Sequence, residues 1–224
     1  MHIVLVVAGT NEPSNSNVLA DSFSEGLRHE PEITVRKFRL KDMKIDHFSL
    51  SHYEPHSPEE EDMKYLRESI ESAAGLVVAT PVWNFGVPAH LKNVIDRMGS
   101  FGLDETHSRG TLKGLPFFLI FTGGAPAPAW KGMLRKTTSF VCEGLRYFGA
   151  THIGTHFEPR CTLGRGKFGL AVDKRPESLE KVRADGEQFA RIAATYARTG
   201  RLPAHSSLHH KGYALAQRLL AKFH

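Results

Sequence analysis

The sequence of 224 residues predicts an α/β protein whose parallel sheet is doubly wound, with helices on both faces and a C-terminal helical extension. Two observations carry this prediction. Short apolar runs recur along the chain, as expected of strands that are buried on both faces. Most of these runs lead through a polar or glycine-rich loop into an amphipathic stretch, and this repeated order of strand, loop and helix builds parallel sheets. We expect five strands.

The first two strands lie near the N-terminus. His2 to Ala8 is an almost continuous apolar run, and a polar loop and an amphipathic helix through about Leu27 follow it. Ile33 to Phe38 alternates apolar and charged residues, which is typical of a half-exposed edge strand. Lys41 to Pro58 is polar, rich in histidine and weakly patterned, so an irregular connection is expected there.

The middle of the chain repeats the pattern. A helix is expected from about Pro58 to Ser72, with Ser57 and Glu60 as a capping box. Gly75 to Ala79 (GLVVA) is short, apolar and rich in β-branched residues, as a buried strand is. Pro88 suits the first turn of the next helix, because its missing N–H costs nothing there. The apolar stripe of that helix consists of Leu91, Val94, Ile95 and Met98.

The last two strands complete the sheet. Ser100 to Gly114 has no period and is expected to form a loop at the ligand-binding rim, before the buried strand Leu115 to Thr122. A helix from about Trp130 to Phe148 leads to a weaker strand, Thr151 to Thr155, and Pro176 to Thr199 is the longest expected helix. Within the doubly wound class we expect the flavodoxin-like order 2-1-3-4-5, with a ligand between strands one and three.

A division into two parts is expected, a domain over residues 1–200 and a tail over residues 201–224. The tail is a basic amphipathic helix that could dock on its own domain, on a second subunit or, less simply, on a membrane surface. Its apolar face comprises Leu208, Leu215, Leu219, Leu220 and Phe223, among the basic residues Lys211, Arg218 and Lys222. A metal site at His205, His209 and His210 is a weak alternative, because no carboxylate completes the ligand set.

Composition narrows the class of protein. With 41% hydrophobic and 24% charged residues, the chain is ordinary for a soluble globular protein. No apolar run is long enough to span a membrane, and the N-terminus reads as a strand and not a signal peptide, so a cytoplasmic protein is expected. The net charge of +5 could attract anionic ligands, but the basic residues are dispersed and no nucleic-acid partner is expected. Cys142 and Cys161 are taken as free thiols, although a disulfide stays possible.

The loop Gly9 to Asn17 (GTNEPSNSN) is predicted to bind an oxyanion. It leaves a strand and enters a helix N-terminus, where free N–H groups and the positive end of the helix dipole attract anions. Neutral donors are supplied by Thr10, Ser14, Asn15, Ser16 and Asn17. The simpler alternative is that Ser16 or Asn17 only caps the helix. A phosphate monoester fits this loop, which is neither a GxGxxG nor a Walker loop.

Two further loops suit a flat heteroaromatic ligand. Pro81 to Val87 joins a strand to a helix, with Trp83 as a stacking face, Asn84 as donor and acceptor, and Gly86 for close backbone approach. Trp83 and Phe85 could instead be loop anchors in the core. The glycine turn Thr122 to Gly124 could point backbone N–H groups at a polar ring edge, or be a plain turn.

The motifs GTNEPSNSN, PVWNFGVPAHLKNVIDR and FTGGA together resemble the NAD(P)H-dependent FMN reductase family, which is similar to quinone reductases and azoreductases of the flavodoxin-like superfamily. They occur in the expected order over about the first 150 residues. The resemblance implies three groups of FMN contacts: Thr10, Ser14, Ser16 and Asn17 for the phosphate; Pro81, Val82, Trp83, Asn84, Phe85 and Gly86 for the ring; and Thr122, Gly123 and Gly124 for its pyrimidine side.

The resemblance also implies an activity. NADPH or NADH would deliver hydride to bound FMN, and a quinone, azo or nitro compound, metal ion or free flavin would accept the electrons. The cofactor carries this chemistry, so no side chain is assigned as catalytic and no metal is expected. His90 and His107 could relay protons, although a solvated or capping role is simpler for His90. A homodimer or homotetramer is expected, with the Ser100 to Lys113 loop as a candidate contact.

Two residues depart from the family pattern. Glu12 stands where relatives often have arginine, so its carboxylate must point away from a bound phosphate or weaken binding. Trp83 replaces a common tyrosine and can still stack. Two alternatives to the reductase stay open: a flavodoxin-type electron carrier without pyridine-nucleotide activity, and a flavin-free binding protein of the same fold. The sequence does not distinguish NADH from NADPH or name the acceptor.

Overall fold

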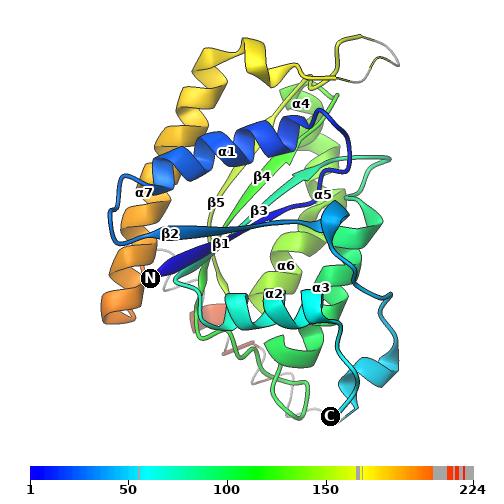
Figure 1. The fold of residues 1–224 in the computed structure, drawn as a ribbon, viewed down its shortest axis with the longest axis vertical. Coiled ribbons are helices and arrows are strands. Elements are labelled where there is room, and N and C mark those ends of the chain that lie inside the picture. Colours follow the sequence, from blue (N-terminus) through cyan, green and yellow to red (C-terminus); the bar gives the residue numbers. More distant parts are fainter. Residues whose placement is uncertain are drawn as a thin grey trace.

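The computed structural model describes residues 1–54, 56–164, 167, 169–203, 211–213, 215–216 and 219. A five-stranded parallel sheet lies at its centre, in the order β2-β1-β3-β4-β5 (Figure 1). The strands are β1 (His2–Val7), β2 (Thr34–Arg39), β3 (Gly75–Pro81), β4 (Pro116–Thr122) and β5 (Thr151–Glu158). The predicted flavodoxin-like fold and strand order are confirmed.

Burial follows position in the sheet. Every residue of β1, β3 and β4 is buried, because helices cover both faces of these central strands. The edge strand β2 buries Phe38 and leaves most of its other residues partly or fully exposed, as the alternating sequence predicted. Strand β5, at the other edge, runs as far as Glu158 and is therefore longer than predicted.

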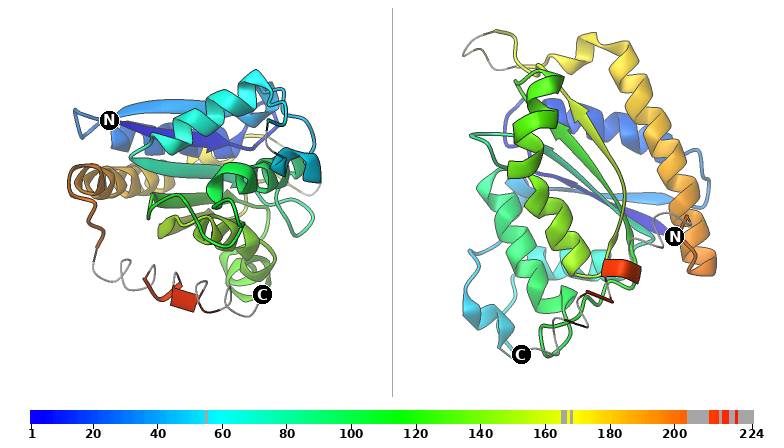
Figure 2. Two further views of the ribbon diagram at one scale, coloured as in Figure 1. Left: turned by 90° about the horizontal axis from the view of Figure 1, so that it is seen from below. Right: turned by 180° about the vertical axis from the view of Figure 1, so that it is seen from behind.

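Two helical layers enclose the sheet, as Figures 1 and 2 show. Helices α1 (Asn15–Leu27) and α7 (Pro176–Thr199) pack on one face, around an apolar cluster that includes Phe23 and Phe189. Helices α2 (Glu61–Glu71), α3 (Ala89–Gly102) and α6 (Ser139–Tyr147) cover the other face. The helices α1 and α7 approach closely at two glycines. A Cβ atom at Gly26 or Gly186 would collide with the facing backbone.

The predicted capping box of α2 is wrong. This helix begins at Glu61, and Glu60 is its N-cap residue without a side-chain cap bond. The Glu60 carboxylate instead accepts two hydrogen bonds from Arg97 on α3, at 2.9 and 2.7 Å, and one from the backbone N–H of Asp46. Arg97 is only 2% exposed, so this ion pair joins two helices inside the protein. A buried guanidinium outcompetes a local cap for the carboxylate.

The single helix predicted from Trp130 to Phe148 is interrupted. Helix α4 (Ala127–Ala129) leads into the π-helical turn η3 (Trp130–Leu134), α5 (Arg135–Thr137) and then α6. The Trp130 ring is buried and stacks on Phe157 of β5 at 4.3 Å, with 4° between the planes. The π-helical turn begins at Trp130, and π-helical turns are frequent at functional sites.

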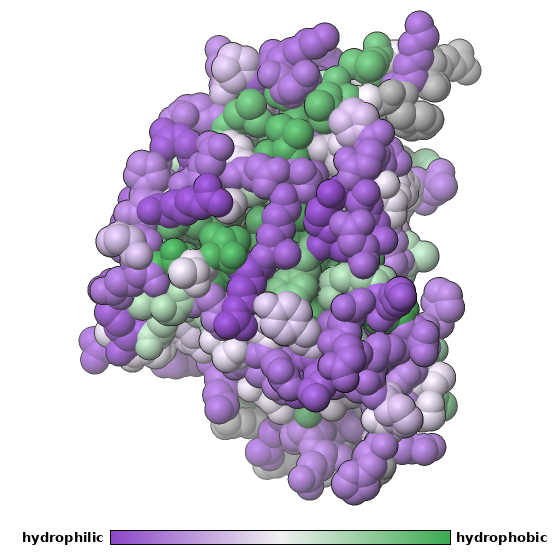
Figure 3. Space-filling model, in the orientation of Figure 1, coloured by the Kyte–Doolittle hydropathy of each residue, from purple (hydrophilic) through white to green (hydrophobic). Residues whose placement is uncertain are grey.

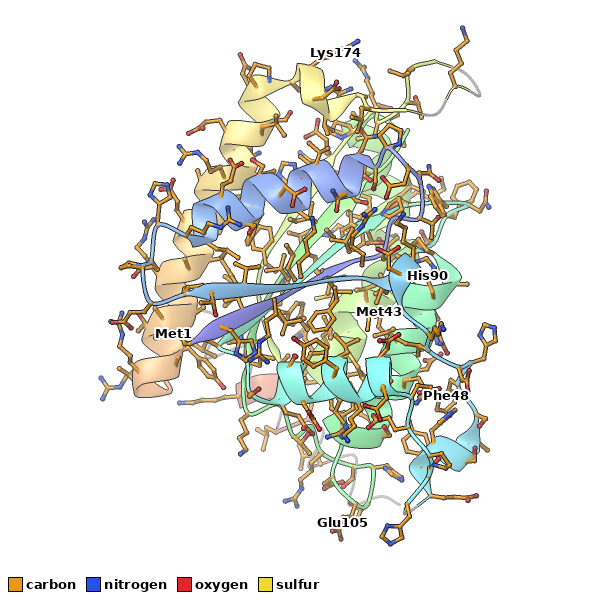
Figure 4. All side chains as sticks on the ribbon, viewed as in Figure 1. Met1, Met43, Phe48, His90, Glu105 and Lys174 are labelled. Carbon is orange, nitrogen blue, oxygen red and sulfur yellow. The ribbon has the colours of Figure 1, made fainter. Side chains whose placement is uncertain are left out.

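The loop after α3 does not lie at the ligand-binding rim, so that prediction is also wrong. Helix α3 runs back to the amino edge of the sheet, and the loop lies there. Figure 4 places Glu105 at one end of the molecule and His90, at the start of α3, far from it. Backbone bonds from Leu112 to Phe148 (3.0 Å) and from Gly114 to Gly149 (2.8 Å) hold the loop against the end of α6.

The short 3-10 helices η1 (Leu40–Asp42), η2 (Leu50–Tyr53) and η4 (Val172–Lys174) complete the ordered elements. Helix α7 ends at Thr199, before Gly200 in a left-handed conformation. In the tail, Arg146 of α6 lies 4.7 Å over the Tyr213 ring, so Tyr213 contacts α6. Leu208, Leu220 and Phe223 of the predicted apolar face lie outside the described residues. Across the described chain, no helix is long and apolar enough to cross a membrane.

Candidate active site

A cavity of about 670 Å³ opens at the carboxyl ends of β1, β3 and β4. Small-molecule sites commonly have volumes of roughly 300–1,000 Å³, and open α/β sheets bind ligands at this edge. Residues from four segments line the cavity: Gly9, Asn11, Glu12, Pro13, Ser14, Asn15 and Ser16; Pro81, Val82, Trp83 and Asn84; Thr122, Gly123 and Gly124; and Cys161, Thr162 and Gly169. The three predicted loops therefore meet around one space.

The loop after β1 presents two serine hydroxyls at the start of α1. Ser14 is the N-cap of the helix, and its Oγ accepts the N–H of Asn17 at 3.3 Å. The cap is therefore Ser14, and not Ser16 or Asn17. The Ser14 and Ser16 hydroxyls lie 3.1 Å apart and both residues are buried. A Cβ atom at Gly9 would lie 2.6 Å from Ser14 Oγ and closer still to Ser16 Oγ, so only glycine leaves this small cradle open.

Two of the predicted phosphate ligands, both among the described residues, lie outside the lining of the cavity. Thr10 is exposed, and the Asn17 side chain donates to Asp21 at 3.0 Å, one turn along the helix. Their predicted role is not supported by side-chain contacts with the cavity. Of the four predicted phosphate ligands, Ser14 and Ser16 line the cavity, beside the backbone at the start of α1.

Glu12 lines the cavity, but its charge is offset. Its carboxylate pairs with Lys41 Nζ at 2.6 Å and with the Arg39 guanidinium. Both cations come from the edge strand β2 and the η1 turn after it. Asp42 lies 3.8 Å from each cation and adds a second negative charge to the group. The four side chains together carry no net charge, so Glu12 does not present an uncompensated charge to an anionic ligand.

The loop after β3 forms a two-residue hairpin. Trp83 and Gly86 exchange backbone hydrogen bonds of 2.9 Å, and Asn84 and Phe85 between them have φ values of 48° and 64°. Positive φ at both central positions is the signature of a type I′ turn. The left-handed strain therefore falls on Asn84 and Phe85, and not on Gly86. Phe85 is 59% exposed, which rules out its role as a core anchor. Trp83 and Asn84 line the cavity, whereas the described residues Phe85 and Gly86 do not.

The glycine turn after β4 is joined to the neighbouring strands. The Gly123 N–H donates to the Glu158 carbonyl at 3.1 Å, because the ladder with β5 continues past the end of β4. Gly123 therefore cannot offer this N–H to a ring edge, and the Gly124 N–H is the candidate donor. The Thr122 carbonyl accepts the Val82 N–H at 2.7 Å, which fixes the turn beside the hairpin.

Sequence reasoning missed the fourth wall of the cavity. Cys161, Thr162 and Gly169 belong to the segment between β5 and α7, which lies beside the start of α1 at the upper end of the molecule in Figure 1. This segment has no regular period or known motif that could have identified it. In Figure 3, apolar side chains reach the surface in this upper region, surrounded by hydrophilic ones. Burial raises the pKa of the Cys161 thiol to about 11, helped by the charge of Glu158, so the thiol stays neutral.

A buried ionic group supports this wall. His156 Nε2 lies 3.2 Å from Glu158, and its other ring nitrogen lies 3.7 Å from Asp185 on α7. Glu158 also accepts Arg175 Nη1 at 2.7 Å and Ser178 Oγ at 3.1 Å. Burial opposes the ionised Glu158, but hydrogen bonds from His156, Arg175 and Ser178 outweigh it and lower its pKa. The end of β5 is thereby tied to α7.

Neither candidate histidine is placed to relay protons. His90 Nε2 is 2.7 Å from the Ala8 carbonyl, where it ties the start of α3 to the end of β1. His107 lies at the opposite edge of the sheet and packs on Tyr53 at 4.6 Å. Cys142 and Cys161 are free. Within the described ranges, no three histidine, cysteine, aspartate or glutamate side chains form a metal site, and His205, His209 and His210 lie outside those ranges.

The lining of the cavity can be compared with the chemical groups of FMN. Ser14 and Ser16 at the start of α1, the Trp83 ring, the Asn84 amide and the glycine turn all line the same space. The volume, the cradle that only glycine leaves open and the neutral donors all match FMN. The chemistry of the donor set therefore fits the cofactor that the resemblance implies.

Comparisons with known proteins agree with this geometry. Residues 1–139 match the sequence model of a family described as NADPH-dependent FMN reductase. An FMN-dependent NADH:quinone oxidoreductase of Nitratidesulfovibrio vulgaris (strain DP4) is 30% identical over 151 residues, which are 61% of this chain and 69% of that protein. One from Shewanella sp. (strain W3-18-1) is 28% identical over 114 residues, 49% of this chain and 56% of that protein.

Solved structures show the same fold. An NAD(P)H:quinone oxidoreductase from Methanothermobacter marburgensis superposes with a TM-score of 0.66 and 20% identity, over 84% of this chain and 96% of that one. An FMN-dependent NADH-azoreductase from Bacillus anthracis str. Ames Ancestor, solved in complex with FMN, has a TM-score of 0.63 and 17% identity over 86% of this chain and 100% of that one.

Proposed function

Because this chain belongs to the NADPH-dependent FMN reductase family of oxidoreductases, we propose that it transfers reducing equivalents from NADPH or NADH, through FMN bound in the described cavity, to a small acceptor. The observation that carries the proposal is the meeting of the serine cradle, Trp83 and the glycine turn around one cavity of about 670 Å³. A quinone or azo compound is the acceptor class that the names of the relatives favour.

The chain's own residues bind and orient in this proposal. Ser14 and Ser16, with the first N–H groups of α1, hold the phosphate. Pro81, Val82, Trp83 and Asn84 would contact the ring, and the Gly124 N–H would be the donor to its polar edge. Thr10, Asn17, Phe85 and Gly86, which were also predicted FMN contacts, do not line the cavity and are not part of this proposal; Gly123 lines it, but its N–H donates to the Glu158 carbonyl.

FMN, when bound, supplies the hydride and electron chemistry. No side chain of the cavity need act as an acid or base. Among the candidates, the His90 ring is engaged by the Ala8 carbonyl, and the raised pKa of Cys161 keeps its thiol protonated near pH 7. The loops contribute stacking, backbone donors and exclusion of water on the buried side of the ligand.

Reconstitution tests the proposal. The purified protein should take up FMN in a stoichiometric amount, show the flavin absorption bands, and lose them anaerobically when NADPH or NADH is added. Protein that binds no FMN would contradict the reductase and support the flavin-free alternative. Protein that binds FMN but does not oxidise NADPH or NADH with a quinone present would point to a flavodoxin-type carrier. A screen of both nucleotides and of quinone, azo, nitro, ferric and flavin acceptors would identify the substrates.

A double variant tests the ring contacts. Trp83→Ala with Asn84→Ala should weaken FMN binding without unfolding the protein, because both residues line the cavity from an exposed hairpin. Tyr65→Ala is a matched control, since Tyr65 is a 55% exposed aromatic residue on α2, outside the cavity. Equal FMN affinity in the double variant and the control would contradict the assignment of the hairpin.

Assembly as a homodimer or homotetramer belongs to the same proposal. Phe85 and Leu163 are 59% and 55% exposed, on the hairpin and on the segment that supplies the fourth wall, and a second copy could cover them. Sedimentation of the FMN-loaded protein measures the state directly. A monomer at micromolar concentration would contradict this part of the proposal and leave the FMN site unaffected.

A further inference from the structure

We propose that Asn15 is a positioning residue that holds the described residues of the segment after β5 (161–164, 167 and 169–172) as the fourth wall of the cofactor cavity; this inference rests on the proposed FMN function and deepens it. The Asn15 side chain bonds to the protein backbone and is therefore not a simple phosphate donor. Asn15 Nδ2 donates to the carbonyls of Gly169 at 2.9 Å and Cys161 at 3.5 Å. Asn15 Oδ1 accepts the N–H groups of Ala171 at 2.8 Å and Val172 at 3.2 Å.

These contacts use both ends of one amide. A side-chain amide has two donors and one acceptor oxygen, and here both kinds of group are occupied by backbone of the same distant segment. The partners lie 146 to 157 residues further along the chain. Asn15 thereby joins the start of α1, where Ser14 and Ser16 lie, to the segment after β5.

The other side of the wall is held independently. The Cys161 N–H donates to the Gly123 carbonyl at 2.9 Å, and the Arg160 N–H donates to the Ala125 carbonyl at 3.2 Å. Arg175 donates to the carbonyls of Pro159 at 2.7 Å and Arg160 at 2.8 Å. The glycine turn and Arg175 thus fix the beginning of the segment. Among the described residues from Thr162 to Val172, none bonds to the glycine turn or to the Arg175 side chain, whereas Asn15 bonds to Cys161 on one side of this part and to Gly169, Ala171 and Val172 at its other end.

The position of the wall matters for the ligand. Cys161, Thr162 and Gly169 line the same cavity as Trp83 and Asn84 of the hairpin. A Cβ atom at Gly124 would lie 3.2 Å from Thr162 Cγ2, so the wall also touches the turn that is proposed to face the ring. If the segment moved outward, the cavity would open along its length, and the ligand would lose contacts with its ring as well as its phosphate.

Asn15→Ala should therefore weaken binding of FMN and of riboflavin by a similar factor, roughly tenfold to a hundredfold each. Ser14, and not Asn15, caps α1, so the start of the helix is retained. Flavin fluorescence titration measures both dissociation constants. If Asn15 acted on the phosphate alone, only FMN binding would weaken, because riboflavin has no phosphate, and this result would overturn the proposal.

Asn93→Ala is a matched control. Asn93 on α3 also bridges backbone groups of one loop, accepting the Phe48 N–H at 2.7 Å and donating to the Asp46 carbonyl at 3.0 Å, but that loop does not line the cavity. The Asn93→Ala variant should lose stability and keep its affinity for both flavins. Equal losses of affinity in Asn93→Ala and Asn15→Ala would overturn the positioning role. Asn15→Ser, a milder change, repeats the test if the alanine variant does not fold.

Proteolysis gives a second readout. Trypsin cleavage after Lys167 in the wild-type protein should slow when FMN is added, because the ligand and Asn15 stabilise the same wall. In Asn15→Ala the site should be cleaved several-fold faster, with little protection by FMN. Unchanged cleavage and protection would contradict the proposal. A wild-type protein that binds no flavin at all would instead refute the proposed function, so the two failures are distinguishable.

Discussion

A single methyl group at Gly9 should disrupt the phosphate cradle. A Cβ atom there would lie 2.6 Å from Ser14 Oγ and closer to Ser16 Oγ, well inside normal contact. Gly9 does not have a positive φ, so alanine is compatible with its backbone and the effect is steric. The two hydroxyls, now 3.1 Å apart, would have to rotate or move out of the cradle.

The size of the effect follows from the bonds that are lost. A hydrogen bond to a charged group contributes about 1.5–3 kcal/mol, so losing two serine donors to a phosphate would cost about 3–6 kcal/mol of binding free energy. This range corresponds to a roughly 10²–10⁴-fold higher dissociation constant for FMN. Riboflavin has no phosphate, so its affinity should change far less. The ratio of the FMN and riboflavin dissociation constants is therefore the sensitive quantity.

Flavin fluorescence titration of the wild type and Gly9→Ala measures this ratio, with circular dichroism to show that both are folded. Gly132→Ala is the matched control, because no atom lies within 4 Å of a Cβ at that exposed glycine, and its ratio should equal that of the wild type. A folded Gly9→Ala variant that keeps the wild-type preference for FMN over riboflavin would refute the assignment of the serine cradle.

Three other predictions concern stability. Arg97 holds the pKa of Glu60 at about 2, so the ion pair contributes fully to stability above the ordinary glutamate pKa, and this stability is lost as pH falls toward 2. Glu60→Gln should lower the free energy of unfolding by about 2–3 kcal/mol in urea at pH 7, and an unchanged stability would contradict the pairing. Burial opposes protonation of His156, but hydrogen bonds to Asp185 and Glu158 outweigh it and raise the pKa of His156. The stability that protonated His156 contributes is complete below about pH 6.5 and is lost as pH rises through the raised pKa, so His156→Gln should flatten that part of the stability–pH curve. Phe85→Gly should stabilise the fold by about 0.5–1 kcal/mol in thermal unfolding, because φ is 64° at an exposed phenylalanine; destabilisation would show that its ring packs usefully.

Local patterns determined most of the architecture. The apolar runs at β1, β3 and β4 and the exact span of α7 were predictable, because burial on two faces and helical periodicity are written in consecutive residues. Local signals failed where a distant partner competed. The predicted capping box at Ser57 does not form, because Glu60 pairs with Arg97 instead. The helix after β4 contains a π-helical turn that begins at Trp130, which stacks on Phe157.

The difference between what the sequence determines and what the tertiary structure decides is clearest at the cavity. By itself, the sequence determined that Gly9 to Asn17, the hairpin after β3 and the glycine turn would meet, because parallel strands bring their carboxyl ends to one edge. Only the tertiary structure decided that Glu12 is offset by Lys41 and that Asn15 holds a fourth wall. Those contacts join side chains to segments far along the chain, and no local pattern of residues encodes a contact of that length.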